Sequence, residues 1–544
     1  ARQLKIDKYT GSLAVGKDAD FAVWSGSPLS SQAVCEKTFV EGILRFDLDT
    51  DKAARTANSA EKTRLLTALE PPKKDEKKPA DPVVPAPEKF TLKTGGAATG
   101  TNERITGGTV ALVGGTVHTV SGAVIPKGTV VVQNGVITAV GETGKVKIPG
   151  GATVVKCDGK HLWPGMIDAN ATAGISEIGS RRETQDDNEQ GEFAPELRAS
   201  VAIYPDAETI MVGRTDGVLS ELVAPSGGTI SGEGTLLNLN GWTVEEMGGK
   251  QAAGLWLNWP AFSTGGRRFG KEEEAEHAHR CEEDMRAGRF TQVQPPVVTR
   301  VPGPGGAAPT APSSGDKAIE EALKNLNEFW EQAQRYAVAK AARPDTPVDQ
   351  KFEAMLPYLT ASKPLFIRAN SEKQIRIAVL WAKKAGQHII IVGGDEADKC
   401  AELLAKEKVP VILGKTCSLP GEEDAAYDDS YTLPARLAKA GVQFCLSSGG
   451  SSADLRHLPF QAAMASAFGM SKEDAVKAMT LWPAQILGYS LGALEAGKQG
   501  NVLITDGDIL EQRTRVLAAY VRGNAVDLTN KQTRLYDRWK SRPT

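Results

Sequence analysis

The sequence predicts an α/β protein in which a (β/α)8 barrel is joined to a small composite β-sandwich. Two observations predict this fold. Short apolar strands alternate with amphipathic helices through the second half of the chain, which is typical of parallel strands buried on both faces. Strand-rich segments with glycine turns stand both before and after that region. At 544 residues the chain is long enough for more than one domain.

Eight strands are expected in the barrel. The segment "KPLFIRA" precedes the helical "SEKQIRIAVLWAKKAG", and "HIIIVG" precedes "DEADKCAELLAKEK". Eight parallel strands are enough to close a barrel, whose functional groups then lie at the carboxyl ends of the strands. The expected strands lie at 162–168, 217–224, 235–240, 254–259, 363–369, 388–393, 409–413 and 442–448.

Composition changes along the chain predict the domain limits. Residues 105–163 and 486–526 are expected to form the composite β-sandwich around a barrel at 164–485, followed by a tail at 527–544. Within the barrel, 265–315 mixes charge with Pro and Gly and is expected to be a disordered surface insertion. A helix with one apolar face follows it. Residues 49–104 are expected to hold a short helix and a Pro-, Lys- and Gly-rich linker.

The two ends of the chain resemble each other. The segment "GSLAVGKDADFAVWSGSPLSSQAVCEKTFVEG" aligns without a gap on "GALEAGKQGNVLITDGDILEQRTRVLAAYVRG", with matched Gly, Leu, Lys and Val positions. Strands like those of 105–160 precede only the second segment. We therefore expect a tandem protein, in which residues 1–48 are the last strands of an upstream copy. The remainder of that upstream copy is expected to pair with residues 11–46.

Composition excludes several classes of protein. Lys and Arg (64) nearly balance Asp and Glu (67), which argues against a nucleic-acid or membrane-surface partner. No apolar run approaches the length of a membrane span. The charged opening "ARQLKIDKY" is no signal peptide, so the chain is expected to be cytoplasmic, or exported with its signal upstream. The six cysteines lack paired short spacings and are expected to be reduced, at Cys35, Cys157, Cys281, Cys400, Cys417 and Cys445.

Several segments together resemble the amidohydrolase superfamily, and most closely its imidazolonepropionase-like branch. These are "DGKHLWPGMIDA", "GALEAGKQGNVLI", the pair "FVEG" and "YVRG", and "VKAMTLWPAQILG". The resemblance covers roughly residues 105–544. It implies a metal-dependent hydrolase of C–N bonds, in which a divalent metal activates water and a carboxylate takes its proton.

The resemblance also implies ligand positions that this chain does not fill. Active members have His-x-His at the end of the first strand, a mid-barrel Lys or Glu, His residues ending the fifth and sixth strands, and Asp ending the eighth. The matching residues here are not metal ligands, and a fixed cation would repel a metal. They are Asn170, Thr172, Arg368, Gly394 and Gly449.

The histidines support the same expectation. His118 and His161 lie in the small strand domain, and His388 begins a strand. His457 follows the last strand, and His277 and His279 lie in the insertion. None stands at the carboxyl end of a barrel strand, so no metal or other cofactor is expected in this barrel. Zinc or another divalent metal is expected only in an active upstream copy.

Four features each leave two interpretations open. The segment "EAEHAHRCEED" either binds a metal or is a solvated loop, and "PSGGTISGEGT" (225–235) either holds an anion or makes tight turns. Arg368 either binds a small anion, with Asn170, Thr172, Ser447 and Ser448 as neighbours, or pairs with an acid of 181–192. Asp168 either acts as a base or has a structural role at the strand end.

These patterns predict a pseudoenzyme: an amidohydrolase-like domain with a degenerate metal site that serves as a structural or ligand-binding partner of an active upstream copy. The alternative is a hydrolase of C–N bonds in cyclic amides or similar small carbonyl compounds, with its metals held by the other copy. A small-anion binding protein is a third hypothesis. The sequence is also compatible with a homo-oligomer.

Overall fold

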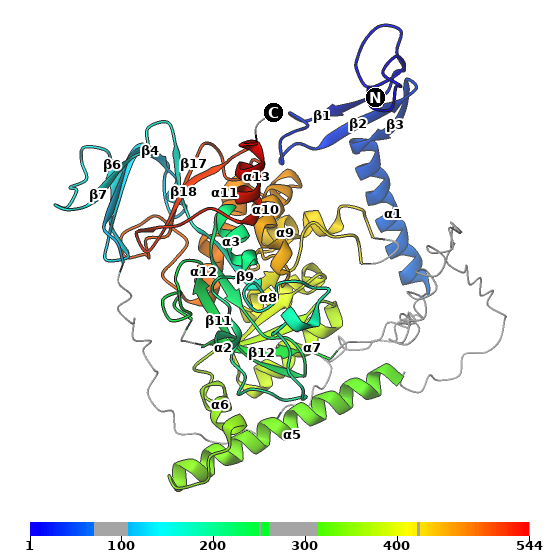
Figure 1. Cartoon of the computed structure of the whole chain (residues 1–544). Coiled ribbons are helices and arrows are strands. Elements are labelled where there is room, and N and C mark those ends of the chain that lie inside the picture. The colour runs from blue at the N-terminus through cyan, green and yellow to red at the C-terminus, as the bar shows by residue number, and fades with distance from the viewer. Residues whose placement is uncertain (70–86, 88–106, 250–251, 261–313, 422–424, 543–544) are drawn as a thin grey trace. The chain divides into compact units, whose positions relative to one another are not determined.

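The computed structural model describes residues 1–69, 87, 107–249, 252–260, 314–421 and 425–542 (Figure 1). Contacts divide the chain into two compact units, one of residues 1–259 and 327–544 and the other of 260–326. The fold below is that of the first unit. The predicted linker at 70–90 and the predicted insertion at 265–315 lie almost entirely outside the described residues.

The barrel is an eight-stranded sheet in which the strands follow one another in chain order from β9 to β16. Each observed strand overlaps one of the eight predicted segments. They are β9 (Met166–Ala171), β10 (Val218–Val223), β11 (Ile230–Asn238), β12 (Ala252–Asn258), β13 (Leu365–Ala369), β14 (Ile389–Gly393), β15 (Val411–Leu413) and β16 (Phe444–Cys445).

The prediction that every barrel strand is parallel is wrong for the third strand. β11 runs antiparallel to β10 and to β12, whereas the remaining neighbours pair in parallel. A parallel crossover needs about a dozen residues, but only 224–229 join β10 to β11. Gly227 and Gly228 have positive φ in this turn, so the segment 225–235 makes a hairpin and part of a strand.

The two end strands of the barrel sheet are joined by the loop that follows β16. The Gly450 N–H donates to the Asn170 carbonyl at 2.9 Å, and the Ser448 N–H donates to the Asp168 carboxylate at 3.1 Å. These bonds link β16 to β9, so the sheet is nearly closed.

Helices and short 3₁₀ turns connect the strands, and an apolar cluster fills the barrel. The centre of that cluster is a stacked pair, Trp256 and Phe366, whose ring centroids are 4.9 Å apart. The helices are α2 (Ala199–Ala202), α3 (Glu208–Thr215), α5 (Ser314–Ala342), α6 (Gln350–Leu359), α7 (Glu372–Ala385), α8 (Ala401–Glu407), α9 (Asp429–Lys439), α10 (Leu458–Ala467), α11 (Lys472–Ala478) and α12 (Leu481–Leu487). The 3₁₀ turns are η1 (Arg182–Thr184), η2 (Ala397–Cys400) and η3 (Ser452–His457).

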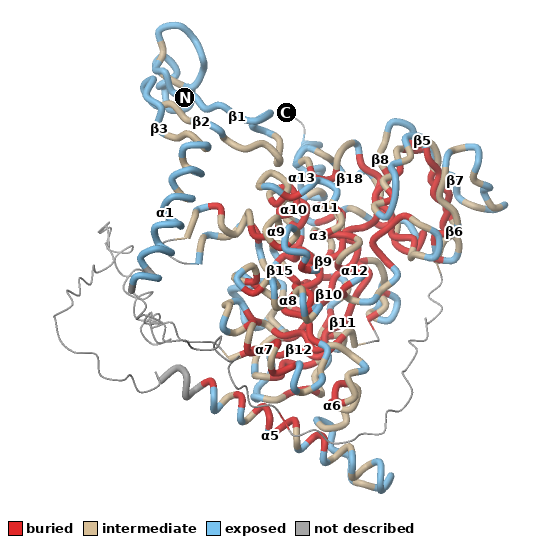
Figure 2. Tube along the Cα trace, turned by 180° about the vertical axis from the view of Figure 1, so that it is seen from behind, coloured by how far each residue is buried: buried red, intermediate tan, exposed pale blue. Residues whose placement is uncertain are grey.

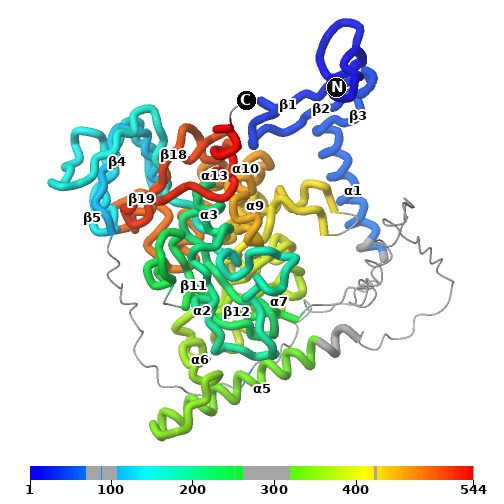
Figure 3. Tube along the Cα trace, viewed as in Figure 1, coloured from blue at the N-terminus to red at the C-terminus, as the bar shows by residue number. Residues whose placement is uncertain are grey.

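A second sheet is built from two distant parts of the chain, as the cyan and red strands of Figure 3 show. β17 pairs antiparallel with β8, which lies more than 300 positions earlier, and the buried side chains of both parts share one apolar cluster. The strands form one continuous sheet, and its folding into a sandwich stays a prediction. They are β4 (Val110–Val117), β5 (Ile125–Gln133), β6 (Val136–Glu142), β7 (Thr153–Lys156), β8 (His161–Pro164), β17 (Val502–Thr505), β18 (Val516–Val521) and β19 (Asn524–Ala525).

Residues 1–69 form a separate three-stranded sheet followed by a helix. The elements are β1 (Phe21–Trp24), β2 (Cys35–Val40), β3 (Ile43–Asp47) and α1 (Leu48–Leu69). The sheet is mostly exposed, in contrast to the buried strands of the barrel (Figure 2). After β19 the chain ends its described part with α13 (Lys531–Lys540).

The described cysteines, Cys35, Cys157, Cys400, Cys417 and Cys445, are all free thiols, and Cys281 lies outside the described residues. Within the described ranges, no helix combines the length and the apolar character that crossing a membrane requires.

Candidate functional site

The end of β9 and the loop after β16 form the floor of the candidate site. Asn170 is buried, and its carbonyl accepts bonds from the Gly450 N–H and from the Ser448 hydroxyl. The Thr172 hydroxyl donates to the Gly450 carbonyl at 2.9 Å. The structure therefore brings Asn170, Thr172 and Ser448 together, and two of these side chains already hold the strand ends in place.

Ser447 serves the neighbouring strand. Its hydroxyl is buried and donates to the Leu413 carbonyl at the end of β15, at 2.5 Å. The same oxygen accepts the Gly449 N–H at 3.2 Å. This hydroxyl therefore both donates and accepts a hydrogen bond within the protein.

Arg368, at the end of β13, is held by a different set of partners. Its guanidinium donates to the Asn258 side chain at 3.1 Å and to the Pro225 carbonyl at 2.9 Å. It also lies over the Trp256 ring, 4.6 Å from the centroid. Burial lowers its pKa to about 10, and the charge of Asp187 acts in the opposite direction. Arg368 thus ties the 225–229 turn to β12.

The two glycines at the predicted lost-ligand positions lie close to neighbouring side chains. A Cβ at Gly394 would come within 2.7 Å of the Val411 side chain, and one at Gly449 within 2.8 Å of the Lys415 side chain. Both glycines have positive φ. Lys415 forms an ion pair with Asp454, so a cation stands beside the position where the resemblance implies a carboxylate.

A buried pair of carboxyl groups lies on β9 and β10. Asp168 and Glu221 are register partners with no exposed surface. Asp168 accepts N–H groups of Asn170 and Ser448, whereas neither Glu221 oxygen has a hydrogen-bond partner among the described residues. Burial raises the pKa of Asp168 to about 6, and burial together with the Asp168 charge raises that of Glu221 well above its usual value.

Sequence reasoning missed Glu221, although one signal was available. An acid in the middle of the otherwise buried strand "VLSELV" cannot reach solvent, so it must be neutral or paired. The structure leaves it unpaired, which favours the protonated form.

A cavity of about 400 Å³ opens beside the ends of β14 and β15. Its wall includes Lys415 and Thr416 from the loop after β15, and Asp395 from the loop after β14. Neither Lys415 nor Thr416 was singled out from the sequence. The Thr416 backbone is set by the Gln461 side chain, which accepts its N–H at 2.8 Å.

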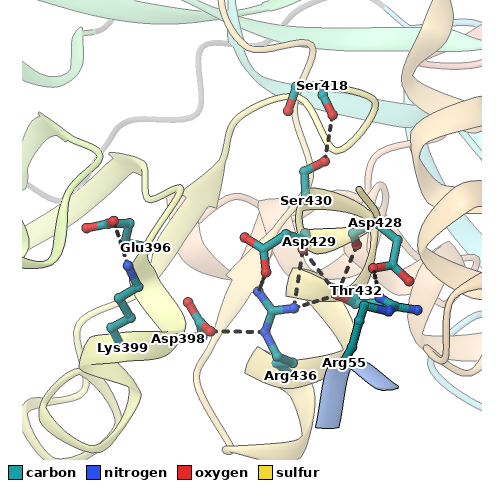
Figure 4. Close-up of polar contacts among 10 residues, drawn as sticks. All are labelled: Arg55, Glu396, Asp398, Lys399, Ser418, Asp428, Asp429, Ser430, Thr432 and Arg436. Atoms are coloured by element: carbon teal, nitrogen blue, oxygen red, sulfur yellow. Dashed lines mark hydrogen bonds and ion pairs between the residues drawn. The ribbon is translucent and has the colours of Figure 1, made fainter. Parts of the chain in front are cut away.

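Most charges around this cavity are already paired (Figure 4). Arg436 bridges Asp398 at 3.0 Å and Asp429 at 2.9 Å, and Lys399 pairs with Glu396 at 2.7 Å. Arg55 of α1 pairs with Asp428 nearby. Asp395 differs, because burial and the Glu396 charge raise its pKa.

The residues at the barrel mouth do not fit the metal centre that the resemblance implies. Amide, hydroxyl and glycine positions replace imidazoles, and Arg368 and Lys415 bring positive charge. In the part of the chain that the structure describes, no three His, Cys, Asp or Glu side chains cluster in a way that could hold a metal. His277, His279 and the "EAEHAHRCEED" segment lie outside that part.

The hydrogen bonds of the described histidines do not involve the residues of the site floor. His118 and His161 contact each other at 2.9 Å in the second sheet, and burial lowers the His118 pKa to about 4. His388 immediately precedes β14, and His457 bonds Asp454 after the last barrel strand.

Comparisons with known proteins bear on the fold rather than on the site residues. Residues 368–533 match the model of the amidohydrolase family. The structure of an amidohydrolase from Thermotoga maritima MSB8 is similar, with a TM-score of 0.62, 24% identity, and coverage of 77% of this chain and 99% of that chain. A β-aspartyl dipeptidase from Fervidobacterium islandicum-AW-1 also aligns, at a TM-score of 0.42, 14% identity, and coverage of 78% and 98%. No curated protein matches the chain.

The fold of the chain is therefore similar to that of an amidohydrolase. The fold rests on the likeness to the Thermotoga structure, and the family match covers the second half of the barrel and the strands that follow it.

Proposed function

We propose that this barrel is a non-hydrolytic amidohydrolase-like domain, a pseudoenzyme that supports a second, active domain of the same kind. The observation that carries the proposal is the state of the ligand positions. Asn170 and Thr172 take part in the bonds that link β9 to the loop after β16, and Arg368 is bound to Asn258 and Pro225.

The electrostatics of the mouth favour the same proposal. Arg368 stays charged at neutral pH even with a lowered pKa, and Lys415 stands beside Gly449. The buried Arg368 cation raises the local potential and opposes the binding of a divalent metal, whereas the charge of Lys415 is paired with Asp454. The same potential favours a small anion beside Arg368, whereas the cavity at Lys415 is also lined by Asp395, Glu396, Asp398 and Asp429.

The alternative proposal is a metal-dependent hydrolase of C–N bonds in cyclic amides or similar carbonyl compounds. The family match supports it, and so does the resemblance to the imidazolonepropionase-like branch. In that case this barrel would still bind no metal in its mouth, and the metals would be held by the other copy.

Metal content tests the proposal. The purified full chain, dialysed against zinc, manganese or nickel and then freed of excess metal, is measured by inductively coupled plasma mass spectrometry. We expect less than about a tenth of an equivalent per chain, because ligand type dominates metal affinity. Near one equivalent that is lost in an Asp168→Asn, Glu221→Gln variant would place a metal in the barrel and overturn the proposal.

A matched control locates any metal found elsewhere. A His277→Ala, His279→Ala variant removes the histidines outside the described residues. If bound metal disappears only in this variant, the barrel remains metal-free and the proposal stands.

A further inference from the structure

The N-terminal sheet and the end of the second sheet share one pattern of strand pairing at a constant offset of 481 positions, the separation of Ser30 from Glu511. In the first, Phe21 pairs with Phe39 and Trp24 with Cys35. In the second, Val502 pairs with Tyr520 and Thr505 with Val516. The register shift lies at the same step in both hairpins.

Local bonds repeat at the same offset. The Asp20 carboxylate accepts the Glu41 N–H at 2.8 Å, and the Asn501 amide oxygen accepts the Arg522 N–H at 3.0 Å. The Gly42 N–H donates to Ala19 at 3.0 Å, and the Gly523 N–H donates to Gly500 at 3.1 Å. Two hairpins with the same register and the same bonds should present the same edge and the same apolar face.

Their surroundings differ sharply. Leu494, Ile504, Leu510 and Val521 are at most 2% exposed. Their counterparts are 82%, 39%, 58% and 41% exposed, in the order Leu13, Val23, Leu29 and Val40. Apolar side chains gain stability when they are buried, so the first hairpin leaves open a surface that the second covers.

The second hairpin shows what covers this surface. β17 pairs antiparallel with β8 along its whole length, and Leu494, Val502 and Ile504 join the apolar cluster of β4, β5 and β8. β1 pairs only with β2 among the described strands, so its other edge is open. An open edge with an apolar face is a template for strand addition.

We propose that the free edge of β1 docks the strand-rich part of a second amidohydrolase-like domain, which supplies a strand equivalent to β8. This inference deepens the proposed function, and it rests on the existence of such a second domain. A second copy of this chain cannot supply the strand, because its β8 lies between β17 and β4 and has no free edge.

The contact between the two hairpins agrees with this partner. The Ser30 hydroxyl donates to Glu511 at 2.8 Å, and the Gln512 N–H donates to the Ser31 hydroxyl at 3.0 Å. Both bonds join positions that are equivalent at the offset of 481. Contacts between equivalent positions are the mark of a two-fold interface, so the two small domains would pack as a pseudo-symmetric pair.

A fusion of the chain's own residues tests the proposal. Residues 105–491 are placed directly before Gly11, so that Gly11 takes the position of Gly492 and β1 that of β17. In the matched fusion, residues 105–528 precede Gly11, so the added segment already contains its own β17–β18 hairpin. The readout is hydrogen–deuterium exchange of the unique peptides that contain Phe21–Trp24.

We expect the β1 amides to exchange about 100-fold more slowly in the first fusion than in the parent chain or the matched fusion. Val23→Asp should abolish this protection, because Val23 matches the buried Ile504. Ile43→Asp should not, because Ile43 matches the exposed Asn524.

Three results would overturn the proposal. In the first, the β1 amides exchange at the same rate in both fusions. In the second, peptides from the added residues 105–491 show an additional unfolded population that the matched fusion lacks. In the third, β1 is already protected in the parent chain, as pairing between two copies would cause. Metal content does not enter this readout, so its result is independent of the test of the proposed function.

Discussion

At the scale of single residues, Glu221 is the most unusual group in the barrel. Its carboxyl is buried beside Asp168 without a hydrogen-bond partner among the described residues. Burying a charge without a partner is far more costly than burying a neutral acid. The folded protein therefore keeps a proton here that the unfolded chain releases.

This raised pKa predicts how stability changes with pH. An acid whose pKa is raised in the folded state stabilises the fold below its unfolded pKa and loses that contribution as pH rises through the folded value. Replacing Glu221 by Gln removes the titration, so the stability of the wild type relative to Glu221→Gln should fall as the pH rises above about 4, the ordinary pKa of an unfolded glutamate. Each unit of pKa difference is worth about 1.4 kcal/mol.

Urea unfolding of both proteins across that range measures the effect. Asp168 remains in both, so its own titration, with a pKa of about 6, contributes to each. A constant stability difference at all pH values would show that Glu221 titrates normally.

Arg368 illustrates how far a single residue can be predicted from sequence. The sequence predicts its place at the end of a barrel strand. It leaves open whether the side chain binds a ligand or has a structural role. Its partners were not predicted, because Asn258 faces it from the neighbouring strand β12 and the Pro225 carbonyl reaches it from the hairpin between β10 and β11.

At the scale of elements, two matched glycines separate backbone strain from packing. Gly42 and Gly523 have φ of 76° and 73° in equivalent turns. A Cβ at Gly42 would meet only Ala19, at 3.7 Å, whereas one at Gly523 would lie 2.6 Å from the Gly108 carbonyl oxygen.

Gly42→Ala should therefore lower the free energy of unfolding by about 1 kcal/mol, which is the ordinary strain of an alanine in the left-handed region. Gly523→Ala should cost about 2 kcal/mol more, because the backbone of Gly108 must move. Chemical denaturation of the two variants measures both values. Equal losses would mean that the environment of the second turn is looser than its contacts indicate.

At the scale of the whole molecule, Asn501 joins the second sheet to the barrel. Its amide donates to Asn238 at 2.6 Å and to Ser220 at 3.2 Å, and its oxygen accepts the Arg522 N–H. Ser220 and Asn238 lie on the barrel strands β10 and β11. A buried network of this kind couples the two sheets.

Asn501→Ala should lower the free energy of unfolding by about 3 kcal/mol, because it leaves several buried polar groups without partners. Amides of β8 and of β10 should lose exchange protection together. Asn524→Ala, on the exposed β19, is the control and should change stability by less than about 0.5 kcal/mol. Loss of protection confined to β8 would show that the sheets unfold separately.

The sequence by itself determined the eight barrel segments and the likeness of the two ends, because apolar periodicity and glycine positions are local properties of the chain. It also predicts that the residues at the strand ends are not metal ligands. Only the tertiary structure decided the direction of β11, the burial of Glu221 beside Asp168, and the cavity beside Lys415. Each of these depends on which strands become neighbours, and that is set by packing across the whole barrel rather than by any one segment.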